Sequence, residues 1–124
     1  MKKRCFDHID LRVRNLAEVR SFYEILLPAL GFNKDAKIDG WIQYERAADA
    51  RAEFFGVTES PNHIANECRI AFWASSVVEV DRLAEVVRRA GGCNIEGPGF
   101  EVPGYYAVFF EDASGNRFEI CHRE

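Results

Sequence analysis

The sequence predicts an α+β fold in which two βαβββ modules form a curved mixed sheet with a concave cup. Three observations lead to this class. At 124 residues, 48% of them hydrophobic, the chain is long enough for one domain with its own core. A strand, a capped amphipathic helix and a glycine occur twice in the same order. Short runs with strand character follow each helix.

The repeat is clearest around the two helices. Aligning Asn15 with Ser76 also aligns Glu18 with Glu79 and Gly31 with Gly92. Asparagine and serine are good N-cap residues, a glutamate three positions later completes a capping box, and glycine in the left-handed conformation ends a helix. We therefore expect two helices, whose apolar faces consist of Val19, Phe22, Tyr23 and Leu26 in the first and Val80, Leu83, Val86 and Val87 in the second.

Strand-like runs define the extent of the two modules. They are expected over 5–13, 32–34, 41–45 and 52–57 in the first half, and over 67–74, 93–96, 105–110 and 117–122 in the second. "DASGN", residues 112–116, is a turn, and the Gly- and Pro-rich segment 97–106 is expected to be a loop at the rim of the cup or a rigid connector. The chain is predicted to be a single domain, 1–124, with module one at about 5–57, a linker at 58–66 and module two at about 67–122.

Charge and cysteine content exclude several functional classes. The net charge is −4 and no long basic run occurs, which argues against nucleic acid or an anionic membrane surface as the partner. No apolar stretch approaches the length of a membrane span. The four cysteines form no CxxC pair and no signal peptide opens the chain, so we expect free thiols and a cytoplasmic location.

Ionisable side chains gather on the face of the predicted sheet that no helix covers. Two sheets, each with one helix-covered face, make a cup when they lie side by side. Period-2 alternation places His8 of the first strand, Arg69 of the matching strand and Glu119 of the last strand toward this cup. Because they come from three strands, we expect these three side chains to converge on a site for a small molecule. By the same alternation, six further side chains are expected to face the cup: Asp10, Arg12, Glu67, Trp73, Arg117 and Cys121.

Paired βαβββ modules with these motifs resemble the vicinal oxygen chelate superfamily, which includes glyoxalase I, extradiol dioxygenases, fosfomycin-resistance enzymes and bleomycin-resistance proteins. The resemblance covers nearly the whole chain and is most specific in "SFYEILLPALGF" and "GYYAVFFEDASGNRFEI". The second motif looks like the small single-domain glyoxalase-like proteins of bacteria. Because this fold supports many chemistries, the resemblance does not select an activity.

The resemblance implies a set of metal-binding positions. The first-strand ligand of the metal-dependent members falls on His8 and the glutamate of the last strand on Glu119; Glu53 is the carboxylate nearest to a further ligand position. The histidine of the second module falls on Arg69. An arginine cannot coordinate a cation, because it stays protonated and has no lone pair to give. A divalent metal (Zn, Mn, Fe or Ni) therefore remains one alternative, and the metal-free form is favoured.

Two functions remain open from the sequence. One is a lyase or isomerase related to glyoxalase with an atypical metal site. The other is a non-catalytic protein of the bleomycin-resistance type that sequesters a drug or metabolite. In the metal-free arrangement, Arg69 would pair with Glu119, and the cup would hold an anionic or oxygen-rich molecule. The resemblance also implies a homodimer, and it leaves open whether the cup is built within one chain or across the two chains. The flat walls of the pocket are expected to come from Trp41, Trp73 and Tyr105 or Tyr106.

Overall fold

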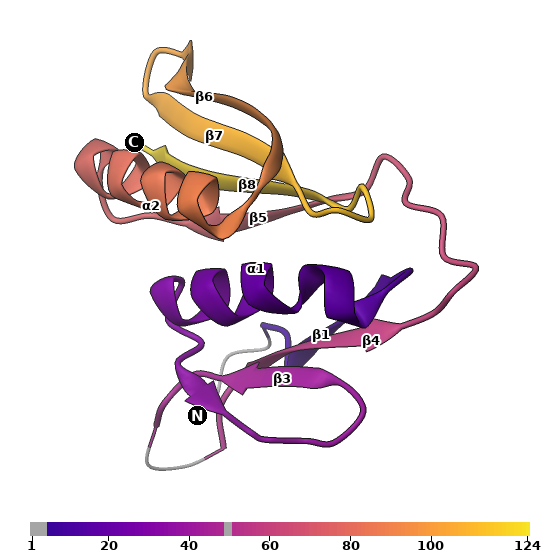
Figure 1. Cartoon of the computed structure of the whole chain (residues 1–124). Coiled ribbons are helices and arrows are strands. Elements are labelled where there is room, and N and C mark those ends of the chain that lie inside the picture. The colour runs from indigo at the N-terminus through magenta and orange to yellow at the C-terminus, as the bar shows by residue number, and fades with distance from the viewer. Residues whose placement is uncertain (1–4, 49–50) are drawn as a thin grey trace.

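The computed structural model describes residues 5–48 and 51–124, which form two helices and two four-stranded sheets (Figure 1). The first module contains β1 (His8–Val13), α1 (Leu16–Ala29), β2 (Lys34–Asp35), β3 (Ile42–Glu45) and β4 (Phe54–Glu59). The second contains β5 (Arg69–Trp73), α2 (Val77–Ala90), β6 (Cys93–Val102), β7 (Tyr105–Glu111) and β8 (Arg117–Arg123). The predicted α+β class with two βαβββ modules is confirmed.

The two sheets have the same topology. Their strand orders are β1-β4-β3-β2 and β5-β8-β7-β6, and in each sheet the first strand of the module pairs in parallel with the last. The other pairs are antiparallel, so both sheets are mixed. An identical order in both halves is the structural counterpart of the repeat in the sequence.

Both helices begin at the predicted caps. The side chain of Asn15 accepts a hydrogen bond from the backbone N–H of Glu18 at 3.2 Å, and Ser76 accepts one from Glu79 at 3.0 Å. Glu79 in turn accepts a hydrogen bond from the backbone N–H of Ser75 at 2.8 Å, which lowers the pKa of its carboxyl group. Helix α2 ends at Gly91, which has the left-handed φ of 92°.

The segment predicted as a rim loop is instead part of a long hairpin. Strand β6 continues to Val102, and β7 begins at Tyr105. The ladder is kept by the pairs Gly99 with Ala107 and Phe100 with Tyr106, with register shifts between the paired positions. These shifts accommodate residues that do not fit a regular strand, which composition alone could not reveal.

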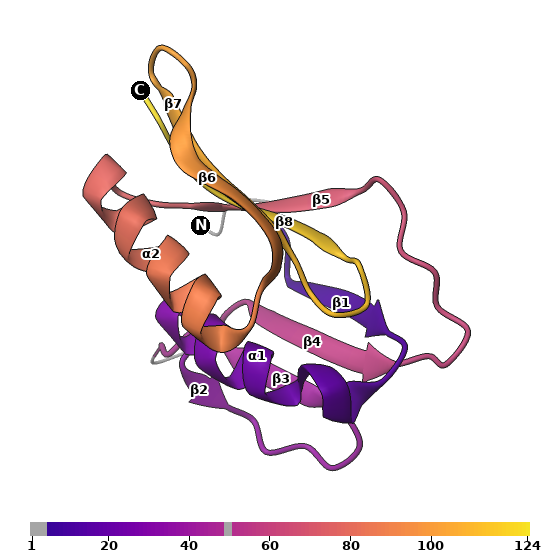
Figure 2. The ribbon, with the colours of Figure 1, turned by 45° about the horizontal axis from the view of Figure 1, so that its top comes forward.

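The two sheets turn their helix-covered faces toward each other. The ring of Phe55 on β4 lies 6.0 Å from Phe72 on β5 and 6.4 Å from Phe118 on β8, and all belong to or pack against one hydrophobic core. Helix α1 lies between the sheets and contacts α2 (Figures 1 and 2). The uncovered face of each sheet, which we call its bare face, therefore points outward. Among the described residues, neither helix is long and apolar enough to cross a membrane.

A buried hydrogen-bond network fastens the second module to α1. The Tyr23 hydroxyl, fully buried in the core, donates to Asp112 at 2.5 Å, and burial is the main reason that its pKa lies well above the usual range. Asp112 begins the predicted 112–116 turn. The same turn contacts the end of β1, since Asn116 donates to the backbone carbonyl of Arg12 at 2.8 Å. The turn thus fixes the relative orientation of the two bare faces.

Candidate functional site

Arg69 projects from the bare face of the second sheet and lies over an aromatic ring. Its guanidinium carbon is 4.7 Å from the centre of the Phe109 ring. Pairing of β5 with β8 places Arg69 opposite Arg117 and places Ala71 opposite Glu119. The expected ion pair between Arg69 and Glu119 does not occur among the described residues, since the guanidinium lies over Phe109 instead. The small side chain of Ala71 leaves space for the guanidinium to lean toward Phe109.

Glu119 is held by a tyrosine on the neighbouring strand. Its side chain is buried, with 6% exposure, and accepts a hydrogen bond from the Tyr105 hydroxyl. The two residues are not directly opposite, since Tyr105 pairs with Arg123 and Phe109 with Glu119. The tyrosine reaches Glu119 across Ala107, whose methyl group leaves room. The hydrogen bond, with a smaller contribution from burial, raises the pKa of Tyr105 to about 12.

Tyr105 is therefore expected to stay protonated at a pH where an ordinary tyrosine ionises. Between pH 10 and about 12 its hydroxyl is neutral in the folded protein and ionised in the unfolded chain, so its contribution to stability is lost as the pH rises through this range. The carbon-13 chemical shift of the ring carbon that bears the hydroxyl should titrate near pH 12. The Tyr105→Phe variant, which lacks this resonance, assigns it. A midpoint near 10 would contradict a hydrogen bond between Tyr105 and Glu119 in solution.

His8 lies on the other sheet, in a separate pocket. Its ring stacks on Phe54 with a centroid distance of 4.4 Å, and Nδ1 lies 2.8 Å from a carboxylate oxygen of Asp7. The pocket has a volume of about 320 Å³ and includes no residue of the second module. Gly56, which has no side chain, opens its floor between Asp10 and Gln43. The residues lining it are His8, Asp10, Trp41, Gln43, Phe54, Gly56 and Thr58.

The structure separates the three side chains that were expected to converge. Glu119 and Arg69 lie on the bare face of the second sheet, whereas His8 lies on that of the first. Since the sheets face each other with their covered sides, the two bare faces of one chain cannot form a common cup. Alternation identified the correct faces, but the packing of the modules decides whether they meet.

The remaining predicted site residues fall into different environments. Trp41 lines the His8 pocket, where its ring N–H donates to Gln43 at 3.1 Å. Trp73 is 70% exposed, and the guanidinium of Arg123 lies 5.0 Å from the centre of its ring.

Tyr106 faces the covered side, because its hydroxyl donates to Asp81 of α2 at 2.6 Å. It is therefore not a wall of the site. Glu53, outside the strands, accepts two hydrogen bonds from Arg46, at 3.0 and 3.2 Å.

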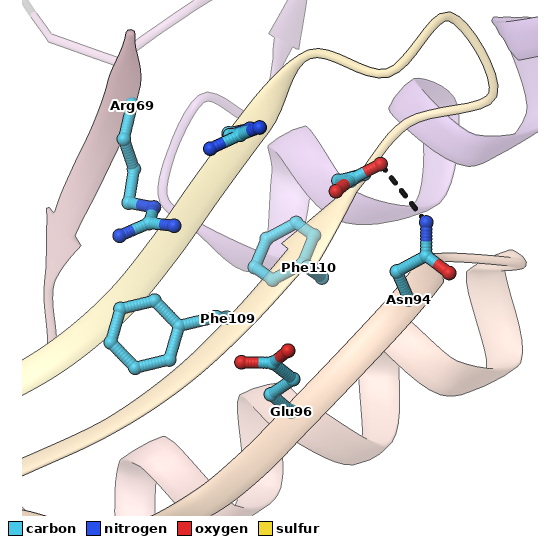
Figure 3. Close-up of a pocket in the computed structure, with 7 residues that line it drawn as sticks. Arg69, Asn94, Glu96, Phe109 and Phe110 are labelled. Atoms are coloured by element: carbon cyan, nitrogen blue, oxygen red, sulfur yellow. Dashed lines mark hydrogen bonds between the residues drawn. The ribbon is translucent and has the colours of Figure 1, made fainter. Parts of the chain in front are cut away.

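Sequence reasoning missed most of a pocket next to Arg69 (Figure 3). Of its lining, only Arg69 and Arg117 had been assigned to the cup. Counting alternate positions along β7 would have added Phe109 and Glu111. The shifted register of β6, in contrast, has no signal in the sequence. The pocket, of about 220 Å³, is lined by Arg69, Asn94, Glu96, Phe109, Phe110, Glu111 and Arg117.

The residues present do not fit a metal site within one chain. No group of three or more histidine, cysteine or acidic side chains comes together among residues 5–48 and 51–124. Arg69, onto which the family resemblance carries a nitrogen ligand, is itself a cation without a free lone pair. Glu119, the carboxylate with the best match, is already the acceptor for Tyr105. The donor chemistry therefore argues against a metal held by this set as it stands.

The two βαβββ modules define a fold class rather than one activity. The chain belongs to the glyoxalase/bleomycin resistance protein/dioxygenase superfamily, whose family model matches residues 6–120. No curated protein gives a significant match.

Solved structures agree with this assignment. A glyoxalase/bleomycin resistance protein from Albidiferax ferrireducens is 25% identical, with 96% of this chain and 98% of that chain covered and a TM-score of 0.76. FosX from Mesorhizobium loti, a fosfomycin resistance protein, is 16% identical, with 99% and 95% covered and a TM-score of 0.71. A FosX mutant from Listeria monocytogenes, in complex with Mn(II) and 1S,2S-dihydroxypropylphosphonic acid, is 21% identical, with 98% and 90% covered and a TM-score of 0.69. The two FosX structures share the fold with this chain.

Proposed function

We propose that this protein binds a small anionic or oxygen-rich molecule, without a metal ion, in a cup formed by two copies of the chain. One observation carries the proposal: where the family resemblance implies a metal-binding histidine, Arg69 presents a guanidinium group that is held over Phe109 and faces a pocket. A fixed positive charge at this point would attract the same oxygen atoms that a cation attracts.

The outward orientation of the bare faces supports a shared cup. In one chain the His8 face and the Arg69 face cannot meet, so the site is incomplete without a second copy. In the proposed homodimer, the His8 pocket of one chain faces Arg69 and Glu119 of the other. Because β1 and β5 are edge strands, each also has unpaired backbone groups along one side that a partner could approach.

The contact between Tyr105 and Glu119 favours a second candidate, a lyase or isomerase. A buried carboxylate that accepts a hydrogen bond from a phenol can accept and return a proton. In this version Arg69 holds a substrate oxygen and Glu119 moves the proton. In the first version the protein only sequesters its ligand, as a bleomycin-resistance protein would. The free thiols of Cys5, Cys68, Cys93 and Cys121 support a cytoplasmic location for either.

Metal content and oligomeric state test the proposal together. We expect less than about 0.1 equivalent of divalent metal per chain by elemental analysis of tag-free protein purified without chelator, because the guanidinium repels a cation. Sedimentation at micromolar concentration should give a dimer. A stoichiometric metal ion would contradict metal-free recognition, and a monomer would contradict the shared cup. Turnover of a hemithioacetal would then distinguish the lyase from the sequestering protein.

A further inference from the structure

Four charged side chains line the pocket beside Arg69. Arg69 on β5 and Arg117 on β8 contribute positive charges, and Glu111 on β7 and Glu96 on β6 contribute negative ones. Phe109 lies in the same pocket, and Figure 3 shows its ring between Arg69 and Glu96. The strand order β5-β8-β7-β6 therefore separates the charges into a basic side and an acidic side.

The two arginines are directly opposed. Residues paired in register on neighbouring strands project from the same face, and Arg69 pairs with Arg117. Like charges in this position destabilise a sheet. The next pair on this face is Ala71 with Glu119, and the Glu119 carboxylate accepts the hydrogen bond from Tyr105 rather than pairing with either arginine. A negatively charged group between the two arginines would offset their repulsion.

The described residues form no ion pair with these arginines. Within residues 5–48 and 51–124, neither arginine forms an ion pair, and neither does Glu96. Glu111 accepts a hydrogen bond from the Asn94 side chain at 3.0 Å but none from Arg117, its partner in register. Opposite charges that share a cavity without pairing are complementary to a molecule that carries both.

We propose that this pocket binds an amino acid whose ammonium and carboxylate groups are separated by several bonds. The carboxylate lies between Arg69 and Arg117, the ammonium meets Glu96, and the methylene chain packs on Phe109. Strands are about 4.8 Å apart, and Glu96 on β6 lies two strand spacings from Arg117 on β8 and three from Arg69 on β5. Long side chains that lean into the pocket shorten this separation, which still suits an ω-amino acid better than an α-amino acid. The inference rests on the proposed function, because Arg69 belongs to both sites, and it names the ligand class.

Three probes with the same four-carbon chain test the inference by isothermal titration calorimetry on the full-length protein. 4-Aminobutyrate carries both charges, butyrate only the carboxylate and butylamine only the ammonium. We expect 4-aminobutyrate to bind saturably, with a dissociation constant at least about tenfold lower than either of the others. Equal affinity for butyrate would overturn the inference and leave metal-free anion binding intact. Absence of binding by all three would also overturn it, while metal content and oligomeric state decide the proposed function separately.

Variants separate the two walls of the pocket. Arg117→Gln should weaken 4-aminobutyrate binding by about tenfold or more, and Glu96→Gln should do the same while leaving butyrate binding unchanged. Because both side chains lie on strands, a substitution could disturb the sheet. Circular dichroism of each variant is therefore compared with that of the natural protein, and we expect the same spectrum. Arg82→Gln and Glu85→Gln, on the surface of α2, change the net charge equally and should have no effect. Wild-type binding by Glu96→Gln would overturn the role of the acidic wall.

Discussion

Replacement of Asp112 by alanine is expected to lower the free energy of unfolding by about 3–5 kcal/mol. The side chain is only 2% exposed and accepts four hydrogen bonds. Its donors are the Tyr23 hydroxyl and, within the turn, the backbone N–H groups of Ser114 and Asn116 and the Asn116 side chain. Alanine would leave these donors without an acceptor in the interior. Since domains of this kind are stable by about 5–15 kcal/mol, the loss is a large part of the total.

Urea denaturation followed by circular dichroism measures this effect. The matched control is Asp81→Ala, which removes the acceptor of another tyrosine, Tyr106, at an exposed position. We expect that control to cost less than about 1 kcal/mol, because water replaces the lost acceptor. Tyr23→Phe should fall between the two. A loss below about 1 kcal/mol for Asp112→Ala would show that the network does not hold the modules together.

Local rules predicted the elements of this fold well. The caps at Asn15 and Ser76 act within one helical turn, and their hydrogen bonds are those that the sequence indicates. Tyr23 was assigned to the apolar face of its helix, where it lies. Its hydrogen bond to Asp112 was beyond prediction, because it joins residues of different modules. A contact of this kind depends on the final packing and has no periodic signature.

For the candidate site, the sequence predicted on which face of a sheet each side chain lies but not which faces meet. Alternation put Arg69 and Glu119 on the bare side of a sheet, which the pairing register shows. Whether the His8 face could meet them depends on how Phe55 and Phe72 pack, and this is a property of the core rather than of the strands. The sequence analysis left open whether the cup is built in one chain or across two, and the packing favours two.

The substitution Arg69→His is expected to create a metal site in the proposed dimer. A neutral imidazole offers a lone pair where the guanidinium offers a positive charge, and with His8 of the second copy and Glu119 it supplies two nitrogens and a carboxylate. We expect the affinity for Mn²⁺, Ni²⁺ or Zn²⁺ to rise at least about 100-fold, or about 2.7 kcal/mol, by calorimetry. Since the metal must compete with Tyr105 for Glu119, adding Tyr105→Phe should raise the affinity further.

Two controls separate ligation from charge. Arg69→Gln removes the same positive charge without supplying a nitrogen donor, so it should gain far less affinity. His8→Ala combined with Arg69→His should lose most of the gain, because one ligand of the set is missing. If Arg69→Gln bound metal as tightly as Arg69→His, electrostatic repulsion alone would exclude the cation in the natural protein. If neither bound metal while sedimentation still showed a dimer, the alignment of Arg69 with the ligand position would be wrong, and the guanidinium would have to be explained by its own pocket alone.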